Sequence, residues 1–260
     1  MKTIKKLAFV ALAFAALGTA MTSCSKDEDK GLTEEYIKKN IIGKWKVVSN
    51  SLGDILTDKQ RINTFEKDGK VYITETRYRD GEFYWNIEKQ ADYKITKDVL
   101  SMSYNYASTT PDEFTVTKLT ADEMGLKYVV PREQGKLTNM TLKRVTVDYS
   151  KDILGLWEGV SMTGYETYGD ANHRIEFKAD GTYDYYNKVG DQWVDVDDDC
   201  RYAVDGDWLA TCWRGDPSSD FFFECWDIDV CNADELKLSA LRQKEDGSRF
   251  KTTFNWKRVK

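Results

Sequence analysis

Short apolar and aromatic runs alternate with polar residues along most of the chain after residue 42, with the two-residue period typical of strands that bury one face. Asp-Gly pairs separate several of these runs, for example at Asp68-Gly69 and Asp180-Gly181. This dipeptide favours tight hairpin turns because both central positions of such turns need φ above zero. The pattern predicts an all-β chain of antiparallel strands. The one helix that we expect is short, from residue 33 to 41, with Thr33 as its N-cap.

The same landmarks occur twice in the same order, which indicates a tandem duplication. Residues 42–49 resemble residues 154–161 at an offset of 112 positions, and three further matches follow at nearly the same offset. We therefore expect two domains, at residues 33–147 and 148–260. Each would contain about eight strands, and a meander of eight strands removes its exposed edges by closing into a barrel.

The amino-terminal segment has the order of a secretion signal, which we expect over residues 1–23. Lysines come first, and the apolar run from Leu7 to Met21 is shorter than the ~20 residues of a membrane-spanning helix. Small residues then lead to Cys24, an arrangement that resembles the bacterial lipobox. The resemblance implies that Cys24 is acylated and anchors the chain to a membrane. The alternative is an ordinary signal peptide with an incidental cysteine.

Residues 24–32 form an acidic tether after the signal. The run from Ser25 to Asp29 resembles an export signal that one group of Gram-negative bacteria uses for the outer face of the outer membrane. This resemblance implies an outer membrane lipoprotein exposed at the cell surface. A plain solvated linker on the periplasmic side is the alternative, because short runs of charge with Ser and Gly are typical of disordered tethers.

Both predicted domains carry a Gly-x-Trp on their first strand and an Arg near the end of their last strand. This pattern resembles the signature of lipocalin and calycin barrels, and both domains are similar to lipocalin-like domains of bacterial lipoproteins. The family implies that the Arg lies over the Trp ring and ties the last strand to the first. The implied pairs are Trp45 with Arg144, and Trp157 with Arg258. A barrel of this size holds one small ligand or is filled by side chains.

Catalytic and metal-binding motifs are scarce. His173 is the only histidine, and we interpret it as a surface or loop residue. The acidic segment 191–199 fails as an EF-hand, because Cys200 and Gly206 stand where the turn glycine and the bidentate Glu are needed. The sequence therefore predicts no catalytic residue, no metal and no cofactor, and the chain is not expected to be an enzyme.

Charge differs sharply between the two predicted domains. The net charge is +2 over residues 31–146 and −10 over residues 147–260. A strongly acidic second domain disfavours nucleic acid and anionic surfaces, and it could prefer a basic or cationic partner.

Four cysteines besides Cys24 fall in the second domain. Cys212 and Cys225 lie on opposite sides of a predicted turn at residues 215–219, so a disulfide between adjacent strands is geometrically reasonable. Other pairings, and buried thiols without any disulfide, remain open.

Aromatic residues are the best indication of a ligand. By strand parity Trp213 faces inward with Leu209, whereas Trp208 faces outward, where it could stack on a sugar or dock a protein. Ordinary core packing is the alternative for the inward set. The candidate ligand-binding residues are Trp85, Tyr104, Tyr183, Trp193, Trp208, Trp213 and Trp226.

Two functions fit this sequence. The first is a lipid-anchored, non-catalytic binding protein that captures a small apolar ligand or a glycan in a barrel mouth or on an aromatic patch. The second is a protein-interaction module, such as an accessory subunit or inhibitor, with filled barrels. An open apolar cavity of several hundred Å³ favours the first function, and packed interiors favour the second.

Overall fold

The computed structural model describes residues 32–79, 82–104, 110–130, 136–164, 172–196, 198–214 and 221–260. The predicted signal, Cys24 and nearly all of the acidic tether lie outside the described residues. Residues 32–260 form one compact unit. Within the described ranges, no helix is long and apolar enough to cross a membrane.

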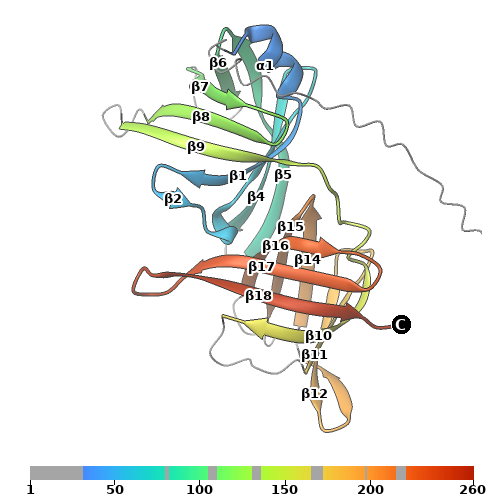
Figure 1. Cartoon of the computed structure of the whole chain (residues 1–260). Coiled ribbons are helices and arrows are strands. Elements are labelled where there is room, and N and C mark those ends of the chain that lie inside the picture. Colours follow the sequence, from blue (N-terminus) through green and yellow to red (C-terminus); the bar gives the residue numbers. More distant parts are fainter. Residues whose placement is uncertain are drawn as a thin grey trace, which may run out of the picture. The chain divides into compact units, whose positions relative to one another are not determined.

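The first sheet contains nine strands in the order β2-β1-β3-β4-β5-β6-β7-β8-β9, and β1 also pairs with β9. This extra pairing closes eight of the strands into a barrel (Figure 1). Its register runs from Lys44 opposite Val145 to Asn50 opposite Met140. The strands are β1 (Gly43–Asn50), β2 (Gly53–Asp54), β3 (Ile62–Phe65), β4 (Lys70–Arg79), β5 (Glu82–Thr96), β6 (Val99–Tyr104), β7 (Asp112–Leu119), β8 (Glu123–Val130) and β9 (Lys136–Val145).

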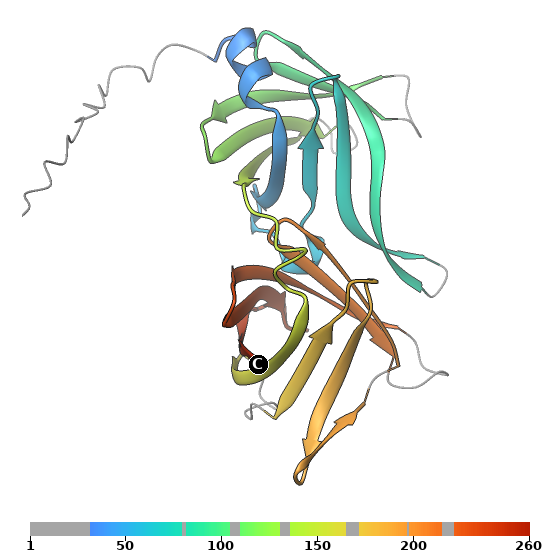
Figure 2. The same ribbon diagram turned by 90° about the vertical axis from the view of Figure 1, so that its right-hand side faces the viewer.

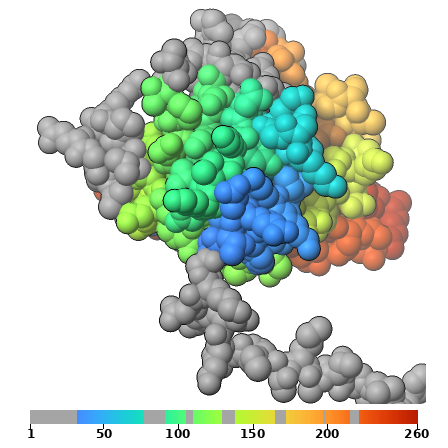
Figure 3. Space-filling view, turned by 90° about the horizontal axis from the view of Figure 1, so that it is seen from above, coloured from blue at the N-terminus to red at the C-terminus, as the bar shows by residue number. Residues whose placement is uncertain are grey.

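One short helix, α1 (Glu34–Asn40), covers part of one end of this barrel, as the view from above shows (Figure 3). Thr33 is its N-cap, as predicted, and its hydroxyl accepts a hydrogen bond from the Tyr36 amide at 3.3 Å. Ile37 and Ile41 are fully buried against the barrel interior. A 3₁₀ turn, η1 (Thr57–Lys59), lies between β2 and β3.

The second sheet also has nine strands, in the order β13-β12-β11-β10-β18-β17-β16-β15-β14. These strands are β10 (Gly155–Thr163), β11 (His173–Phe177), β12 (Tyr183–Val189), β13 (Gln192–Asp195), β14 (Asp198–Asp205), β15 (Trp208–Arg214), β16 (Phe222–Cys231), β17 (Glu235–Gln243) and β18 (Arg249–Arg258). The predicted all-β fold with two tandem antiparallel sheets is confirmed.

The second sheet curls into a barrel shape, but it does not close completely, since its end strands β13 and β14 do not pair with each other. An isolated bridge joins Thr182, just before β12, to Arg201 of β14. The reason is that β12 turns back into a hairpin with β13, which pairs Asn187 with Val194 and occupies the edge that β14 would need. The hairpin projects away from the rest of the sheet (Figures 1 and 2). We call this curled sheet the second barrel.

Ion pairs join the two barrels. Side chains alternate between the two faces of β1, and its lysines lie on the outer face, where they meet carboxylates of the second barrel. The Lys46 Nζ lies 2.8 Å from Asp207 Oδ1 and 2.8 Å from Asp227 Oδ1, and Lys46 is only 6% exposed. Burial lowers the pKa of Lys46, but attraction to Asp227 and Asp207 outweighs it and leaves the pKa above its ordinary value. Lys44 pairs with Asp205 beside it. The acidic second barrel therefore finds cationic partners within the same chain.

An apolar cluster lies beside these ion pairs. It contains Ile62 of the first barrel and Trp208, Ala210, Cys212 and Cys225 of the second. Each of these residues is less than 5% exposed. The interface thus has a buried apolar centre in addition to its ion pairs, which is typical of stable contacts between domains.

Candidate functional site

The predicted Trp and Arg residues meet at one end of each barrel. The Arg144 Cζ lies 4.0 Å from the centroid of the Trp45 ring, and the Arg258 Cζ lies 4.0 Å from the Trp157 ring centroid. Each Arg is the direct register partner of its Trp. Both Trp rings are fully buried, and their Nε1 atoms donate to carbonyl oxygens at 2.6 and 2.7 Å. Each barrel is therefore sealed at this end.

The glycines of the two Gly-x-Trp motifs are required by this seal. Gly43 and Gly155 have φ values of +118° and +109°, which residues with a Cβ rarely adopt. A Cβ on Gly155 would lie 3.0 Å from Arg258 Nη1, and one on Gly43 would lie 3.1 Å from Arg144 Nη1. The motif thus provides both the backbone turn and the space for the guanidinium group.

The interiors of the two barrels differ. The void inside the first barrel is only about 10 Å³ and is bounded by side chains such as Phe65, Met102 and Leu142. The second barrel contains a partly open cavity of about 360 Å³. The first interior is filled by side chains, whereas the second has room for a small molecule.

The walls of the cavity come from alternate residues on neighbouring strands, as the two-residue period of a strand requires. Side chains at these positions point to the inner face of the curled sheet, and their neighbours point outward. Two strands show the pattern, β11 with His173, Ile175 and Phe177, and β15 with Leu209, Thr211 and Trp213.

Along β15 and β16 the wall of the cavity changes from an apolar pair, through a polar pair, to an aromatic pair toward its open end. Across β15 and β16 the facing pairs are Leu209 with Trp226, then Thr211 with Glu224. The last pair, Trp213 with Phe222, stacks with ring centroids 6.0 Å apart. The other end of β16 lies near Arg258, which donates to the Asn232 carbonyl at 3.3 Å. Apolar groups therefore line the part of the cavity nearer the sealed end, and a polar pair followed by an aromatic pair lies nearer the open end.

His173 and Asn187 form a polar pair at the mouth. They are register partners on β11 and β12, and His173 Nδ1 lies 2.6 Å from Asn187 Oδ1. The imidazole ring stacks on Tyr185 with centroids 5.6 Å apart and meets Phe254 edge-on at 6.3 Å. Because these contacts fix the ring, the pair offers an oriented hydrogen-bonding edge to an occupant of the cavity.

Two tryptophans line the deeper wall. The Arg242 Cζ lies 4.5 Å from the Trp226 ring centroid, and its guanidinium is 3.3 Å from Glu224 Oε1, so a cation–π contact and an ion pair hold this ring in place. Trp256 is 3% exposed, and its Nε1–H makes no hydrogen bond within the described residues. A buried donor without an acceptor costs about 1–3 kcal/mol.

The predicted ligand-binding residues fall in different places. Trp213 and Trp226 line the cavity. Tyr183 is 5% exposed and packs in the second core, while Trp193 lies on the projecting hairpin with the Arg174 Cζ 4.2 Å from its ring centroid. The remaining candidates on the first barrel are Tyr104, which packs against the filled core, and Trp85 on β5, whose side chain lies outside the described residues.

Sequence reasoning missed several cavity residues, of which His173 is the most informative. It is the first residue of β11 and is half-buried in the cavity wall, so its interpretation as a surface or loop residue is wrong. The two-residue spacing of His173, Ile175 and Phe177 is a signal that could have placed it inside. Asn187, Phe254 and Trp256 were missed in the same way.

Trp208 faces out of its own barrel, as parity predicts, but it is not available to a sugar or to another protein. It is fully buried, and its Nε1 donates to the Thr57 carbonyl oxygen of the first barrel at 3.2 Å. The partner that covers this outward aromatic residue is the other half of the same chain.

The predicted Cys212–Cys225 disulfide is absent, and all four cysteines of the second barrel are buried thiols. The register explains why, since Cys212 lies opposite Phe223 and Cys225 lies opposite Ala210. The two cysteines are therefore diagonal neighbours, which is an unfavourable position for a disulfide between adjacent strands.

Within the described ranges, no group of three or more His, Cys, Asp or Glu side chains is placed to hold a metal ion. Asp197 of the acidic segment lies outside those ranges. The described part of the segment belongs to β13 and the start of β14, on opposite edges of the second sheet.

No family model and no curated protein matches the chain. Several solved structures are weakly similar, including the following three. A protein of unknown function of the DUF3598 family from Nostoc punctiforme is 13% identical over 88% of this chain and 100% of that chain, with a TM-score of 0.27. Transferrin binding protein B of Neisseria meningitidis serogroup B is 8% identical over 80% and 67%, with a TM-score of 0.26. That of Haemophilus parasuis is 10% identical over 76% and 54%, with a TM-score of 0.23. Similarity at this level does not indicate what this chain does.

Proposed function

We propose that this chain is a non-catalytic binding protein that holds a small, largely apolar ligand in the second barrel. The observation that carries the proposal is the contrast between the 360 Å³ cavity of the second barrel and the filled interior of the first. Ligand pockets of proteins occupy about 300–1,000 Å³ and combine apolar walls with a few polar groups. The cavity fits the lower part of that range.

The arrangement of the walls specifies the ligand further. Its apolar part would contact Trp226, Leu238 and Phe254, and its polar part would lie at the mouth beside His173 and Asn187. An acceptor atom on the ligand would also suit the Trp256 N–H, which makes no hydrogen bond with the described residues. A compact ring compound with one or two polar substituents meets all three conditions, whereas a fully hydroxylated sugar does not.

Thermal unfolding of the whole chain tests this function. A ligand that binds only the folded state increases the free energy of unfolding, by about 2.7 kcal/mol at a concentration of 100 Kd, and therefore raises the melting temperature. We expect neutral compounds such as 1-naphthol to raise the melting temperature in a saturable manner and glucose to leave it unchanged. A higher melting temperature with glucose alone would indicate a glycan ligand and contradict an apolar one. An unchanged melting temperature with every compound would refute ligand capture.

The packed interior of the first barrel favours a second function, that of a protein-interaction module. Phe222 is 53% exposed at the rim of the second barrel, and an exposed large aromatic residue often marks a contact surface. This function predicts that no small molecule raises the melting temperature, so the same experiment separates the two.

We further propose that the protein is a lipoprotein of the outer membrane, exposed at the cell surface and anchored through Cys24. Support comes from the order of residues 1–29 alone, with a charged start, an apolar run, small residues before Cys24 and an acidic run after it. Incorporation of labelled palmitate in cells, lost in Cys24→Ala, tests the anchor. Digestion of the protein by a protease added to intact cells tests its exposure, and resistance to that protease would place it on the periplasmic face.

A further inference from the structure

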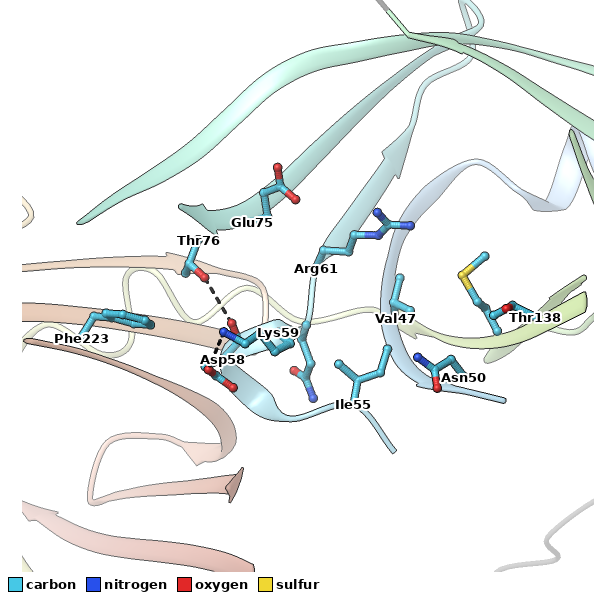
Figure 4. A pocket seen from close by; sticks show the side chains of 12 residues that line it. Val47, Asn50, Ile55, Asp58, Lys59, Arg61, Glu75, Thr76, Thr138 and Phe223 are labelled. Atoms are coloured by element: carbon cyan, nitrogen blue, oxygen red, sulfur yellow. Dashed lines mark hydrogen bonds and ion pairs between the residues drawn. The ribbon is translucent and has the colours of Figure 1, made fainter. Parts of the chain in front are cut away.

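A second pocket, of about 440 Å³, lies at the unsealed end of the first barrel. Its lining includes Val47 and Asn50 of β1, the segment that leads into β3, and Phe223 of the second barrel (Figure 4). Val47, Arg61 and Met140 also bound the small void inside the barrel, so the pocket adjoins the filled interior. We call it the mouth pocket.

The mouth pocket contains a cation, Arg61, whose side chain has no partner among the described residues. The guanidinium of Arg61 is half-buried, and within the part of the chain that the structure describes it makes no hydrogen bond or ion pair. Figure 4 shows it extending toward Val47, whereas the Glu75 carboxylate extends the other way. The other carboxylate of the pocket, Asp58, is paired with Lys59 at 3.1 Å. Arg61 therefore presents an unused donor fork that matches a carboxylate.

The side-chain oxygens of two buried amides beside Arg61 also receive no hydrogen bond from the described residues. Gln60 lines the mouth pocket at 7% exposure, and Asn63 lines the adjoining void at 5% exposure. Neither Gln60 Oε1 nor Asn63 Oδ1 receives a hydrogen bond from the described residues. Buried acceptors without donors are uncommon and costly, so their position next to an unpaired guanidinium points to a polar occupant.

We infer that the mouth pocket binds a small hydroxylated carboxylic acid, of the sugar-acid type. Its carboxylate would accept hydrogen bonds from the Arg61 guanidinium, and a hydroxyl group would donate to Gln60. This site is independent of the apolar cavity proposed above, because the two share no lining residue and select opposite chemistry. The chain would then carry one apolar and one polar acidic ligand at separate places.

Calorimetric titration of the whole chain with glucuronate, glucose and hexanoate tests the inference. Glucose lacks the carboxylate and hexanoate lacks the hydroxyl groups, so we expect saturable binding of glucuronate and at least tenfold weaker binding of the other two. Equal binding of all three, or no binding of glucuronate, would overturn the proposal without affecting the apolar cavity.

Variants locate the site. Arg61→Met should weaken glucuronate binding at least tenfold, and Arg61→Lys, which keeps the charge but loses the fork, should weaken it less. Lys127→Met removes the same charge from an exposed position on β8 of the same barrel and should leave binding unchanged. Unchanged binding in both Arg61 variants, or equal loss in the Lys127 variant, would place glucuronate elsewhere and overturn the assignment.

Discussion

The indole N–H of Trp208 in the second barrel donates to the carbonyl oxygen of Thr57 in the first barrel, over 3.2 Å. The Thr57 side chain makes a second bond between the barrels, in which its Oγ1 accepts a hydrogen bond from the Leu241 amide at 2.9 Å. Both Trp208 and Thr57 are buried, at 0% and 1% exposure. The η1 turn is therefore bonded to the wall of the second barrel, and the two barrels are a packed pair.

Trp208→Ala should lower the free energy of unfolding by about 3–5 kcal/mol, because it leaves a cavity the size of an indole in a buried interface. The measurement is urea unfolding of the whole chain, followed by circular dichroism. Trp193→Ala is the control, since this ring lies on the projecting hairpin and its loss should cost about 1 kcal/mol or less. Equal costs for the two variants would contradict a packed interface.

The ion pairs of Lys46 make the free energy of unfolding fall at alkaline pH. Its pKa is raised above the ordinary value of 10.5 in the folded state, so its contribution is fully present below that value and is lost as the pH rises through the folded pKa. We expect Lys46→Met to lower the free energy of unfolding by about 1–3 kcal/mol at pH 7–9, with the difference from wild type shrinking above pH 10.5. A difference that stays constant up to pH 11.5 would show that the ion pairs contribute nothing.

Residue patterning predicted much of this fold. The period of two predicted the strands, because it is a local signal. The pairs of Trp45 with Arg144 and Trp157 with Arg258 were implied by the resemblance of the doubled Gly-x-Trp and Arg pattern to lipocalin barrels, and both contacts are present in the structure. The alternation of side chains along a strand also predicted that Trp208 faces out of its own barrel. What covers Trp208 could not be predicted, because parity says which face a side chain is on and nothing about what docks there.

The incomplete closure of the second barrel could not be predicted, because the pattern of apolar and polar residues does not distinguish between two ways of pairing the same strands. The segment from Tyr183 to Asp195 reads equally well as part of a barrel wall or as a separate hairpin, and only the hairpin takes the edge that closure needs. The position of His173 was missed because it begins its strand, where a polar residue usually indicates a loop. Neither signal is decisive without the register of the neighbouring strands.

The Arg seals should be structural in both barrels. Arg144 stacks on Trp45 and donates to three carbonyl oxygens, those of Asn40, Ile42 and Ala121. Arg144→Met keeps much of the aliphatic packing but loses the donors, so we expect a loss of about 2–4 kcal/mol in urea unfolding. The exposed Lys118, paired with Glu123 on the surface, is the control, and Lys118→Met should change stability by less than about 1 kcal/mol. A similar effect of both substitutions would contradict the sealing role.

The cysteines of the second barrel should be unreactive thiols in the folded chain. Burial raises the pKa of Cys225 to about 12 and that of Cys231 to about 11, so almost no thiolate exists at pH 8. We expect Ellman's reagent to modify the thiols of the second barrel only after unfolding in guanidinium chloride, and a reductant to leave the melting temperature unchanged. Detection of a Cys212–Cys225 peptide by mass spectrometry under non-reducing conditions would contradict this prediction.

The central claim is that the second barrel takes a small apolar molecule, and a fluorescence titration with N-phenyl-1-naphthylamine tests it most directly. Met162 lines the cavity opposite Phe254, so Met162→Trp should fill it, whereas Val160→Trp adds the same ring at a 53% exposed position on the same strand. We expect saturable binding of one probe per chain in wild type and Val160→Trp, and binding at least tenfold weaker in Met162→Trp. Equal binding in both variants, or no saturable binding in wild type, would contradict the claim.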